Sequence, residues 1–305
     1  MLSYVAALRH ELGERSRAYA VARKLPHAVS YGPSQVTCFE PCQEGHGNFI
    51  SASYRAILKN PDWNKRLSKV HTSGKRALPA RSCGKWCELD SSNSSDALLM
   101  NIFCYPKLLA NWRITALLGV LASCQPIFGL KARVPLQEGK TDRTEVDLKL
   151  GNLLVESKLT ESGFQQRSCE ALARYKDFNT VFEVGELPRA GEMFISYQLI
   201  RNILAAYAIG CSFCLLVDSR RPDLREAFYR ILRCVKESDL RSRSKLLTWQ
   251  ELSGALPPAL RAFLAEKYGI TPSAIVIPRR AGSQRRASRD QSIGHRIGSQ
   301  FHAPA

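Results

Sequence analysis

The sequence has few acidic residues for its size. Its 305 residues include 27 Asp and Glu against 44 Lys and Arg, so the formal net charge is +17. A balance this far from neutral favours polyanionic partners, through counterion release and long-range electrostatic attraction. The charge alone does not distinguish DNA, RNA and an anionic membrane surface.

Long apolar runs are also missing. The most apolar region, residues 98–124, is interrupted by a proline, an asparagine and two cations, so the ~20 consecutive apolar residues of a membrane span are absent. Residues 1–26 show the pattern of an Arg-containing amphipathic helix without the apolar centre of a secretory signal, and two glutamates there argue against an organelle presequence. We therefore expect an intracellular, cytoplasmic protein.

The chain has ten cysteines. Most stand among apolar residues and are expected to be thiols in a reducing compartment. Cys38 and Cys42, with Cys83 and Cys87, form two C-x3-C pairs that together offer four ligands for zinc or an iron–sulfur cluster. Because their spacing departs from the knuckle pattern, we interpret them as unrelated thiols rather than a structural zinc or iron–sulfur site.

Residues 144–158 predict a β-hairpin at the centre of the chain. Val146, Leu148 and Leu150 alternate with polar residues, which is typical of a strand with one buried face. Gly151-Asn152 tolerates the positive φ of a tight turn, and the second strand runs from residue 153 to 158.

Three charged side chains of this hairpin are expected to meet on one face. Glu156 and Lys158 are two residues apart, so they project from the same face about 7 Å apart, and the paired strand can place Asp147 beside them. Two adjacent carboxylates repel unless a cation lies between them, and hard oxygen ligands suit Mg²⁺. A lysine there can orient or help deprotonate a water and offset charge on a phosphate. The alternative is an exposed hairpin with ordinary surface charges.

An acid on one strand followed by Glu-x-Lys on the next resembles the active-site signature of the PD-(D/E)xK nuclease superfamily, the restriction-endonuclease-like fold. By position, Asp147 matches the first metal-binding acid, Glu156 the second and Lys158 the catalytic lysine. The chain departs from the pattern at Val146, where a proline often precedes the first acid. The resemblance implies a phosphodiester hydrolase that uses Mg²⁺, with Mn²⁺ as a substitute.

The order of predicted elements agrees with that resemblance. A helix near residues 97–103, strands near 127–136, 144–150 and 153–158, a helix over 193–209 and a strand over 211–218 give the αβββαβ core of the superfamily. We therefore predict an α/β fold with a central mixed sheet flanked by helices, preceded by an N-terminal extension. The predicted divisions are a basic N-terminal subdomain (1–90), a nuclease-like domain (91–278) and a disordered basic tail (279–305).

Two further residues resemble supporting groups of that superfamily. An acid on the helix before the first core strand helps position metal or water in several branches. Glu88, Asp90 and Asp96 are the candidates, with Asp96 closest to the helix, although capping or first-turn dipole stabilisation explains Asp96 equally well. Gln198 resembles a glutamine that supports the site from the helix after Glu-x-Lys. Gln198, Arg201 and Asn202 form one polar stripe on an otherwise apolar helix, which predicts either burial at the active-site edge or solvent exposure.

Basic residues in two segments are the predicted nucleic-acid contacts, because Lys and Arg bind phosphates and neighbouring aromatics can stack on bases. The first segment, residues 59–85, carries a single acid, Asp62, and the alternative there is a solvated basic surface. The predicted contacts of the two segments are Lys65, Arg66, Lys69, Arg167, Arg174 and Lys176.

The sequence therefore favours a Mg²⁺-dependent DNA endonuclease of restriction or repair type. Cleavage of both strands usually needs two active sites, which a homodimer would supply. The first alternative is a nucleic-acid-binding protein that has a nuclease-like fold without a working site. The second is an N-terminal metal-stapled interaction module fused to the core.

Overall fold

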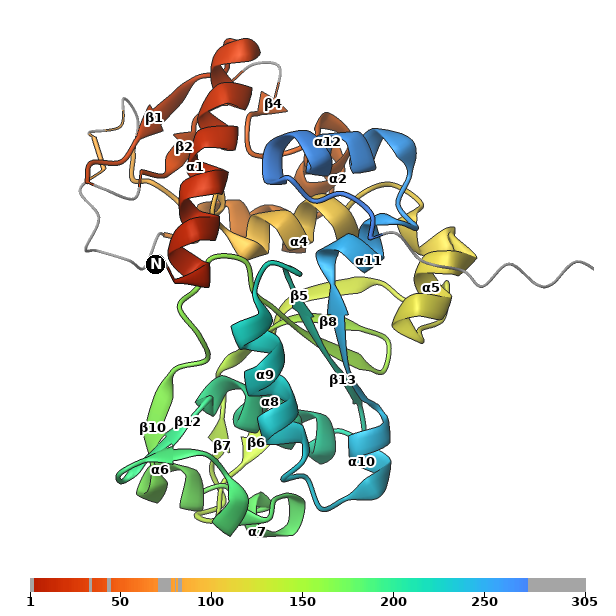
Figure 1. The fold of residues 1–305 in the computed structure, drawn as a ribbon. Helices are drawn as coiled ribbons and strands as arrows, with labels where there is room; N and C mark the ends of the chain where they lie inside the picture. Colours follow the sequence, from red (N-terminus) through yellow and green to blue (C-terminus); the bar gives the residue numbers. More distant parts are fainter. Residues whose placement is uncertain are drawn as a thin grey trace, which may run out of the picture. The chain divides into compact units, whose positions relative to one another are not determined.

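A five-stranded mixed sheet forms the centre of the computed structural model, which describes residues 3–32, 35–42, 45–70, 78–79, 81 and 84–273 (Figure 1). The strand order is β14-β13-β9-β8-β5. β5, β8 and β9 are antiparallel to their neighbours within this group, whereas β13 is parallel to both β9 and β14. The bounds are β5 Pro126–Lys131, β8 Glu145–Leu150, β9 Leu153–Ser157, β13 Ser212–Val217 and β14 Ser244–Thr248.

The predicted hairpin is present as β8 and β9. Val146, Leu148 and Leu150 are fully buried, as their alternation with polar residues indicates. The turn depends on Gly151, whose φ of +56° is a left-handed value that glycine adopts without steric cost. The hairpin register pairs Leu148 with Val155 and Leu150 with Leu153.

Helices cover both faces of the sheet and create two apolar clusters. Leu148 and Val155 face a cluster that includes side chains of α1, α4, α11 and α12. Leu154 and Leu215 face a second cluster that includes side chains of α8 and α9. The helices are α1 Tyr4–Ala22, α2 Ser51–Lys59, α3 Pro61–Asn64, α4 Ser95–Phe103, α5 Trp112–Leu118, α6 Cys169–Ala173, α7 Phe178–Val181, α8 Tyr197–Ala208, α9 Pro222–Leu232, α10 Ser238–Ser242, α11 Trp249–Ser253 and α12 Pro258–Tyr268.

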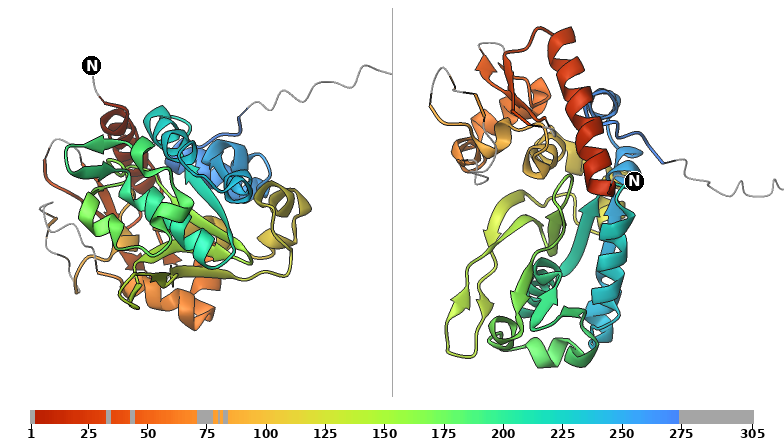
Figure 2. Two further views of the ribbon diagram at one scale, coloured as in Figure 1. Left: turned by 90° about the horizontal axis from the view of Figure 1, so that it is seen from below. Right: turned by 60° about the vertical axis from the view of Figure 1, so that its left-hand side comes forward.

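Smaller elements extend the two ends of the central sheet (Figure 2). Helix α1 packs against α12, so the two ends of the described chain share one core cluster. The short strands are β1 His27–Val29, β2 Thr37–Phe39, β3 Pro41–Cys42, β4 Gly45–His46, β6 Val134–Pro135, β7 Thr141–Asp142, β10 Gln166–Ser168, β11 Arg189–Ala190 and β12 Met193–Ile195. The 3₁₀ helices are η1 Lys65–Ser68, η2 Glu88–Asp90, η3 Leu108–Ala110 and η4 Val184–Glu186.

Two predicted helices are wrong in part. The segment predicted as helix over 193–209 begins as strand β12, and α8 starts only after Ser196, whose φ of +65° breaks the helical path. The spacing of residues 163–178 likewise predicts a helix, whereas the structure has strand β10 there before the short helix α6. In both cases pairing between β10 and β12 replaces local helical preference. The division at residues 90–91 stays a prediction, and the predicted tail lies outside the described residues.

Lys267 is a fully buried lysine in the cluster that joins α1 and α12. Its Nζ donates hydrogen bonds to the Gly47 carbonyl at 3.1 Å and to Asn48 Oδ1 at 2.5 Å. Among the described residues no carboxylate forms an ion pair with it. Its Nζ lies 4.4–5.6 Å from the centroids of four aromatic rings, those of Tyr19, Phe39, Phe263 and Tyr268.

We expect the wild type to gain stability relative to a Lys267→Met variant as the pH rises from about 7 to about 9. Burial lowers the pKa of Lys267 well below its ordinary value. Between the folded and unfolded pKa values the unfolded chain binds one more proton, so the free energy of unfolding rises with pH. Urea unfolding of both proteins at both pH values measures this, and a stability difference that does not change with pH contradicts a lowered pKa.

No helix within the described ranges combines the length and apolar character needed to cross a lipid bilayer.

Candidate active site

Asp147 and Glu156 face each other across the β8–β9 pair. The last paired residues of the register are Leu148 and Val155, so one further step places Asp147 opposite Glu156. Asp147 Oδ2 accepts hydrogen bonds from the Ser157 backbone N–H at 2.7 Å and from the Ser157 hydroxyl at 2.9 Å. Ser157 therefore fixes the direction of the Asp147 carboxylate toward β9.

Glu156 and Lys158 are a buried ion pair at the end of β9. Their side chains are 3% and 7% exposed, and Lys158 Nζ lies 2.8 Å from Glu156 Oε1. The other oxygen of Glu156, Oε2, accepts a hydrogen bond from Asn202 Nδ2 at 2.7 Å. The backbone at Lys158 is held by bonds to Leu216 and to Trp249, whose indole N–H donates to the Lys158 carbonyl at 3.0 Å.

The pKa values of Asp147 and Lys158 are both raised in this site. Burial and the charges of Glu156 and Asp96 raise the pKa of Asp147 well above its ordinary value, despite the opposing effect of Lys158. Burial alone would lower the pKa of Lys158, but the surrounding carboxylates more than offset it and raise that pKa. Lys158 is therefore a cation at neutral pH, and Asp147 is destabilised in its ionised form until a cation approaches.

Asp96 stands in the first turn of α4 and is engaged by two cations. Arg66 Nη2 lies 2.6 Å and Lys69 Nζ 3.5 Å from Asp96 Oδ2. Arg66 also lies 3.7 Å from Glu145, and its side chain is only 12% exposed. Helix capping is done by Ser94, whose side chain accepts the Ala97 N–H, so Asp96 is not the cap.

The polar stripe of α8 is directed inward at this site. Asn202 contacts Glu156, and buried Arg201 donates to the backbone carbonyls of Thr144 and Glu145 at the start of β8. Gln198 lines a cavity together with Lys158. The solvent-exposed alternative for Arg201 and Asn202 is therefore wrong.

The predicted nucleic-acid contacts occupy different environments. Arg66 and Lys69 are paired with carboxylates as described, and exposed Lys65 lies 3.0 Å from Asp62. Arg167 covers the ring of Tyr197, Arg174 lies 3.4 Å from Glu138, and Lys176 is exposed on the surface.

Three exposed cations beside the carboxylates were absent from the predicted set. Lys131, Arg133 and Arg143 line one hollow next to β5 and form no ion pair with any described residue. We call these three residues the β5 basic cluster. Gly129 of β5 lies opposite Asp147 in the register, so the cluster is close to the acids along the strands. The spacing of Lys131 and Arg133 by two residues was the sequence signal for it.

Two carboxylates and a lysine fit the needs of Mg²⁺, which is usually held by one or two protein carboxylates plus waters and substrate phosphates. Asp147 Oδ1 accepts no hydrogen bond from the described residues. The pKa of Asp147 is raised by burial and by nearby negative charge, and a cation would offset that charge. Within the described ranges, no three His, Cys, Asp or Glu side chains are grouped so that they could hold a metal ion. Cys38 is buried, Cys42 is exposed and Cys87 is intermediate, while Cys83 lies outside the described residues.

The family model described as "Restriction Endonuclease associating with ARP" matches residues 16–269. Because this match covers most of the chain, the chain belongs to this restriction-endonuclease-like family. No curated protein and no solved structure is significantly similar to this chain. The mixed α/β fold with its central five-stranded sheet agrees with that membership, and the family description indicates a nuclease-like function.

Proposed function

We propose that this protein is a Mg²⁺-dependent endonuclease that hydrolyses phosphodiester bonds of DNA. The observation that carries the proposal is the meeting of Asp147, Glu156 and Lys158 at the end of the β8–β9 hairpin. The family membership supports a nuclease. In this proposal α4, β5, β8, β9, α8 and β13 correspond to the αβββαβ core.

Asp147 and Glu156 would hold the metal together with waters and substrate oxygens. The predicted third acid, Asp96, is paired with Arg66 and Lys69. When bound, Mg²⁺ supplies a positive charge that favours the attacking water and the charge that develops on the phosphate. Both oxygens of Glu156 already accept hydrogen bonds, and each has lone pairs left for a cation.

Lys158 would act as a fixed cation rather than as a base. Its raised pKa keeps the ammonium protonated at neutral pH, so it cannot readily take a proton from water. The ammonium can instead donate hydrogen bonds to the attacking water and to a non-bridging phosphate oxygen. Glu156 holds Lys158 in place for that role, and Asn202 holds Glu156.

The direct test of this proposal is the chemistry of the products. We expect cleavage of an end-labelled DNA duplex with Mg²⁺ to leave 5′-phosphate and 3′-hydroxyl ends that DNA ligase can reseal. Products with 5′-hydroxyl ends, or equal cleavage of an RNA duplex of the same sequence, would be incompatible with the proposed chemistry or substrate.

An Asn202→Leu variant should need more Mg²⁺ and cleave about 10- to 100-fold more slowly at limiting metal. The reason is that Asn202 orients Glu156 through its 2.7 Å hydrogen bond without touching the substrate itself. Cleavage rates over a Mg²⁺ series measure this, with Asn179→Leu at an exposed position of α7 as the matched control. An unchanged Mg²⁺ dependence would show that Asn202 does not position the acid.

Alanine at all three residues of the β5 basic cluster should weaken DNA binding and reduce the slope of log K against log salt by about 3, since each phosphate contact contributes about 0.9. The matched control removes the same charge elsewhere, at exposed Arg225, Arg230 and Arg241. Gel shifts over a salt series distinguish the two sets. Equal losses of slope in both variants would mean that the cluster has no particular contact with DNA.

A further inference from the structure

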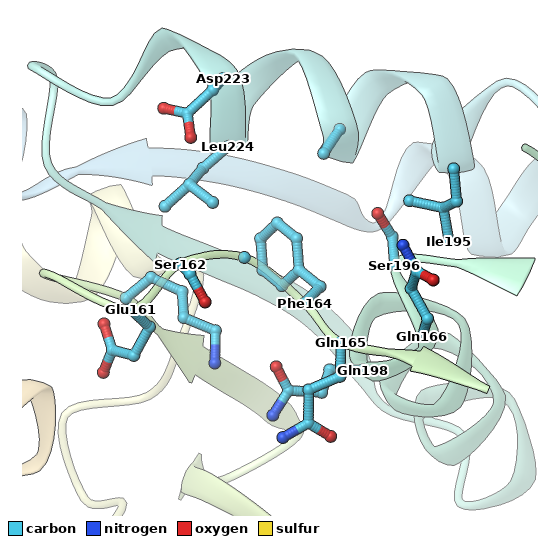
Figure 3. A pocket seen from close by; sticks show the side chains of 13 residues that line it. Glu161, Ser162, Phe164, Gln165, Gln166, Ile195, Ser196, Gln198, Asp223 and Leu224 are labelled. Atoms are coloured by element: carbon cyan, nitrogen blue, oxygen red, sulfur yellow. The ribbon is translucent and has the colours of Figure 1, made fainter. Parts of the chain in front are cut away.

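A cavity of about 500 Å³ opens beside Lys158 and is not used by the proposed hydrolysis. Its walls come from the loop after β9, from the start of α8 and from α9 (Figure 3). Phe164, Leu224 and Ile195 supply its apolar surface. The volume lies in the range of small-molecule sites and exceeds what a metal ion or a single water needs.

Amide side chains give this cavity both hydrogen-bond donors and acceptors. Gln165, Gln166 and Gln198 line it, and Figure 3 shows the amides of Gln165 and Gln198 on the same side of Phe164. Gln198 Oε1 is buried and has no hydrogen-bond partner among the described residues. A buried acceptor left unpaired is costly, so a ligand that donates to Gln198 would be favoured there.

The charges at the cavity favour a neutral ligand over a phosphate. Two carboxylates line it, Glu161 and Asp223. Glu161 is held by the Ser95 hydroxyl and the Leu159 N–H, and Asp223 by the guanidinium of buried Arg221. The one cation on the described wall, Lys158, is already paired with Glu156. An anionic group would therefore meet net negative charge.

The backbone around the cavity is held in unusual conformations. Gln165 and Ser196 have φ values of +59° and +65°, which side-chain-bearing residues rarely adopt. Hydrogen bonds from the Tyr197 and Gln198 N–H groups to the carbonyls of Gln165 and Phe164 lock the two segments together. Such conformations concentrate at ligand sites, where the surrounding structure fixes them.

We propose that this cavity receives an unpaired nucleobase adjacent to the phosphate that is cleaved. A nucleobase is flat, neutral and rich in both donors and acceptors, so it matches an apolar wall with amides and repelling carboxylates. Lys158 lines the cavity and is also paired with Glu156. A base in the cavity would therefore lie next to a phosphate held at Asp147 and Glu156. The inference rests on the proposed nuclease function and names its substrate class: DNA with an unpaired nucleotide.

The test compares a DNA duplex containing one unpaired 2-aminopurine with the fully paired duplex. Wild-type protein with Mg²⁺ should cleave the unpaired substrate at least about tenfold faster, since extracting a paired base costs a few kcal/mol. Binding with Ca²⁺ in place of Mg²⁺ should change the fluorescence of the unpaired 2-aminopurine. Equal cleavage of both duplexes together with unchanged fluorescence would overturn the inference.

Two variants connect these signals to the cavity. Ala227→Phe fills it from α9 and should bring the cleavage ratio to about one and abolish the fluorescence change, whereas Ala262→Phe at an exposed site of α12 should retain both. Gln198→Leu removes the orphaned acceptor at nearly constant volume, so it should fold normally and still lose much of the fluorescence change. Unaltered signals in both cavity variants would overturn the inference. A fluorescence change that Ala227→Phe abolishes, without cleavage of any DNA, would support the base site while contradicting the nuclease proposal.

Discussion

Replacing Asp147 with Asn should slow DNA cleavage by about 1,000-fold or more, because removing a metal-binding charge costs several kcal/mol of transition-state stabilisation at about 1.4 kcal/mol per tenfold. The amide retains the shape of the side chain, and its oxygen can still accept the hydrogen bonds from Ser157. The fold should therefore be preserved. Single-turnover cleavage of a defined duplex, with DNA affinity measured in parallel, separates lost chemistry from lost binding.

The matched control for this substitution is Asp239→Asn. The Asp239 side chain is 83% exposed, and among the described residues it pairs only with Arg243 at the end of α10, so its loss should leave cleavage unchanged. DNA affinity of the Asp147→Asn variant should be equal to or higher than that of the wild type, since one negative charge near the phosphates is removed. Full cleavage by Asp147→Asn would eliminate this residue from the proposed site.

Lys158→Met should lower the cleavage rate by about 100- to 1,000-fold, as loss of one preorganised donor to a developing charge does in other hydrolytic sites. Methionine keeps an unbranched chain of similar length but removes the ammonium that lies 2.8 Å from Glu156. DNA affinity should change little, because binding depends on many other cations.

Lys149→Met is the matched control for this second variant. Lys149 is half-buried on β8, two residues from Asp147, and forms no ion pair with a described residue. It should retain cleavage near the wild-type rate. If Lys158→Met and Lys149→Met cleave equally well, Lys158 has no part in the reaction and only the acidic pair remains as evidence for hydrolysis.

The fold was most predictable where a short alternation of apolar and polar residues determined the secondary structure. The alternation in residues 146–150 and the glycine at 151 were sufficient for the β8–β9 hairpin, because burial of one face fixes the register. Strand β14 was missed because Ser244–Thr248 is short and begins with polar residues. Its place depends on parallel pairing with β13, a tertiary interaction without a local signature.

In the candidate site, too, the residues close in sequence could be predicted, whereas those brought in by tertiary packing could not. Asp147, Glu156 and Lys158 could be predicted together because they are close along one hairpin. The residues that surround them come from distant segments. Asn202 on α8 donates to Glu156, and Arg66 pairs with Asp96 across 30 residues of sequence. An isolated sequence cannot reveal such pairs, because they exist only after the helices have packed on the sheet.

The proposed cleavage depends on a divalent cation and three neighbouring side chains acting on a phosphodiester. The most direct measurement is the conversion of supercoiled plasmid by the purified wild-type protein, with Mg²⁺ and with excess EDTA, beside the Asp147→Asn variant. We predict open-circular and linear products only for the wild type with Mg²⁺. Supercoiled plasmid that stays intact with every divalent metal, or conversion that persists in EDTA or in the variant, would contradict the account.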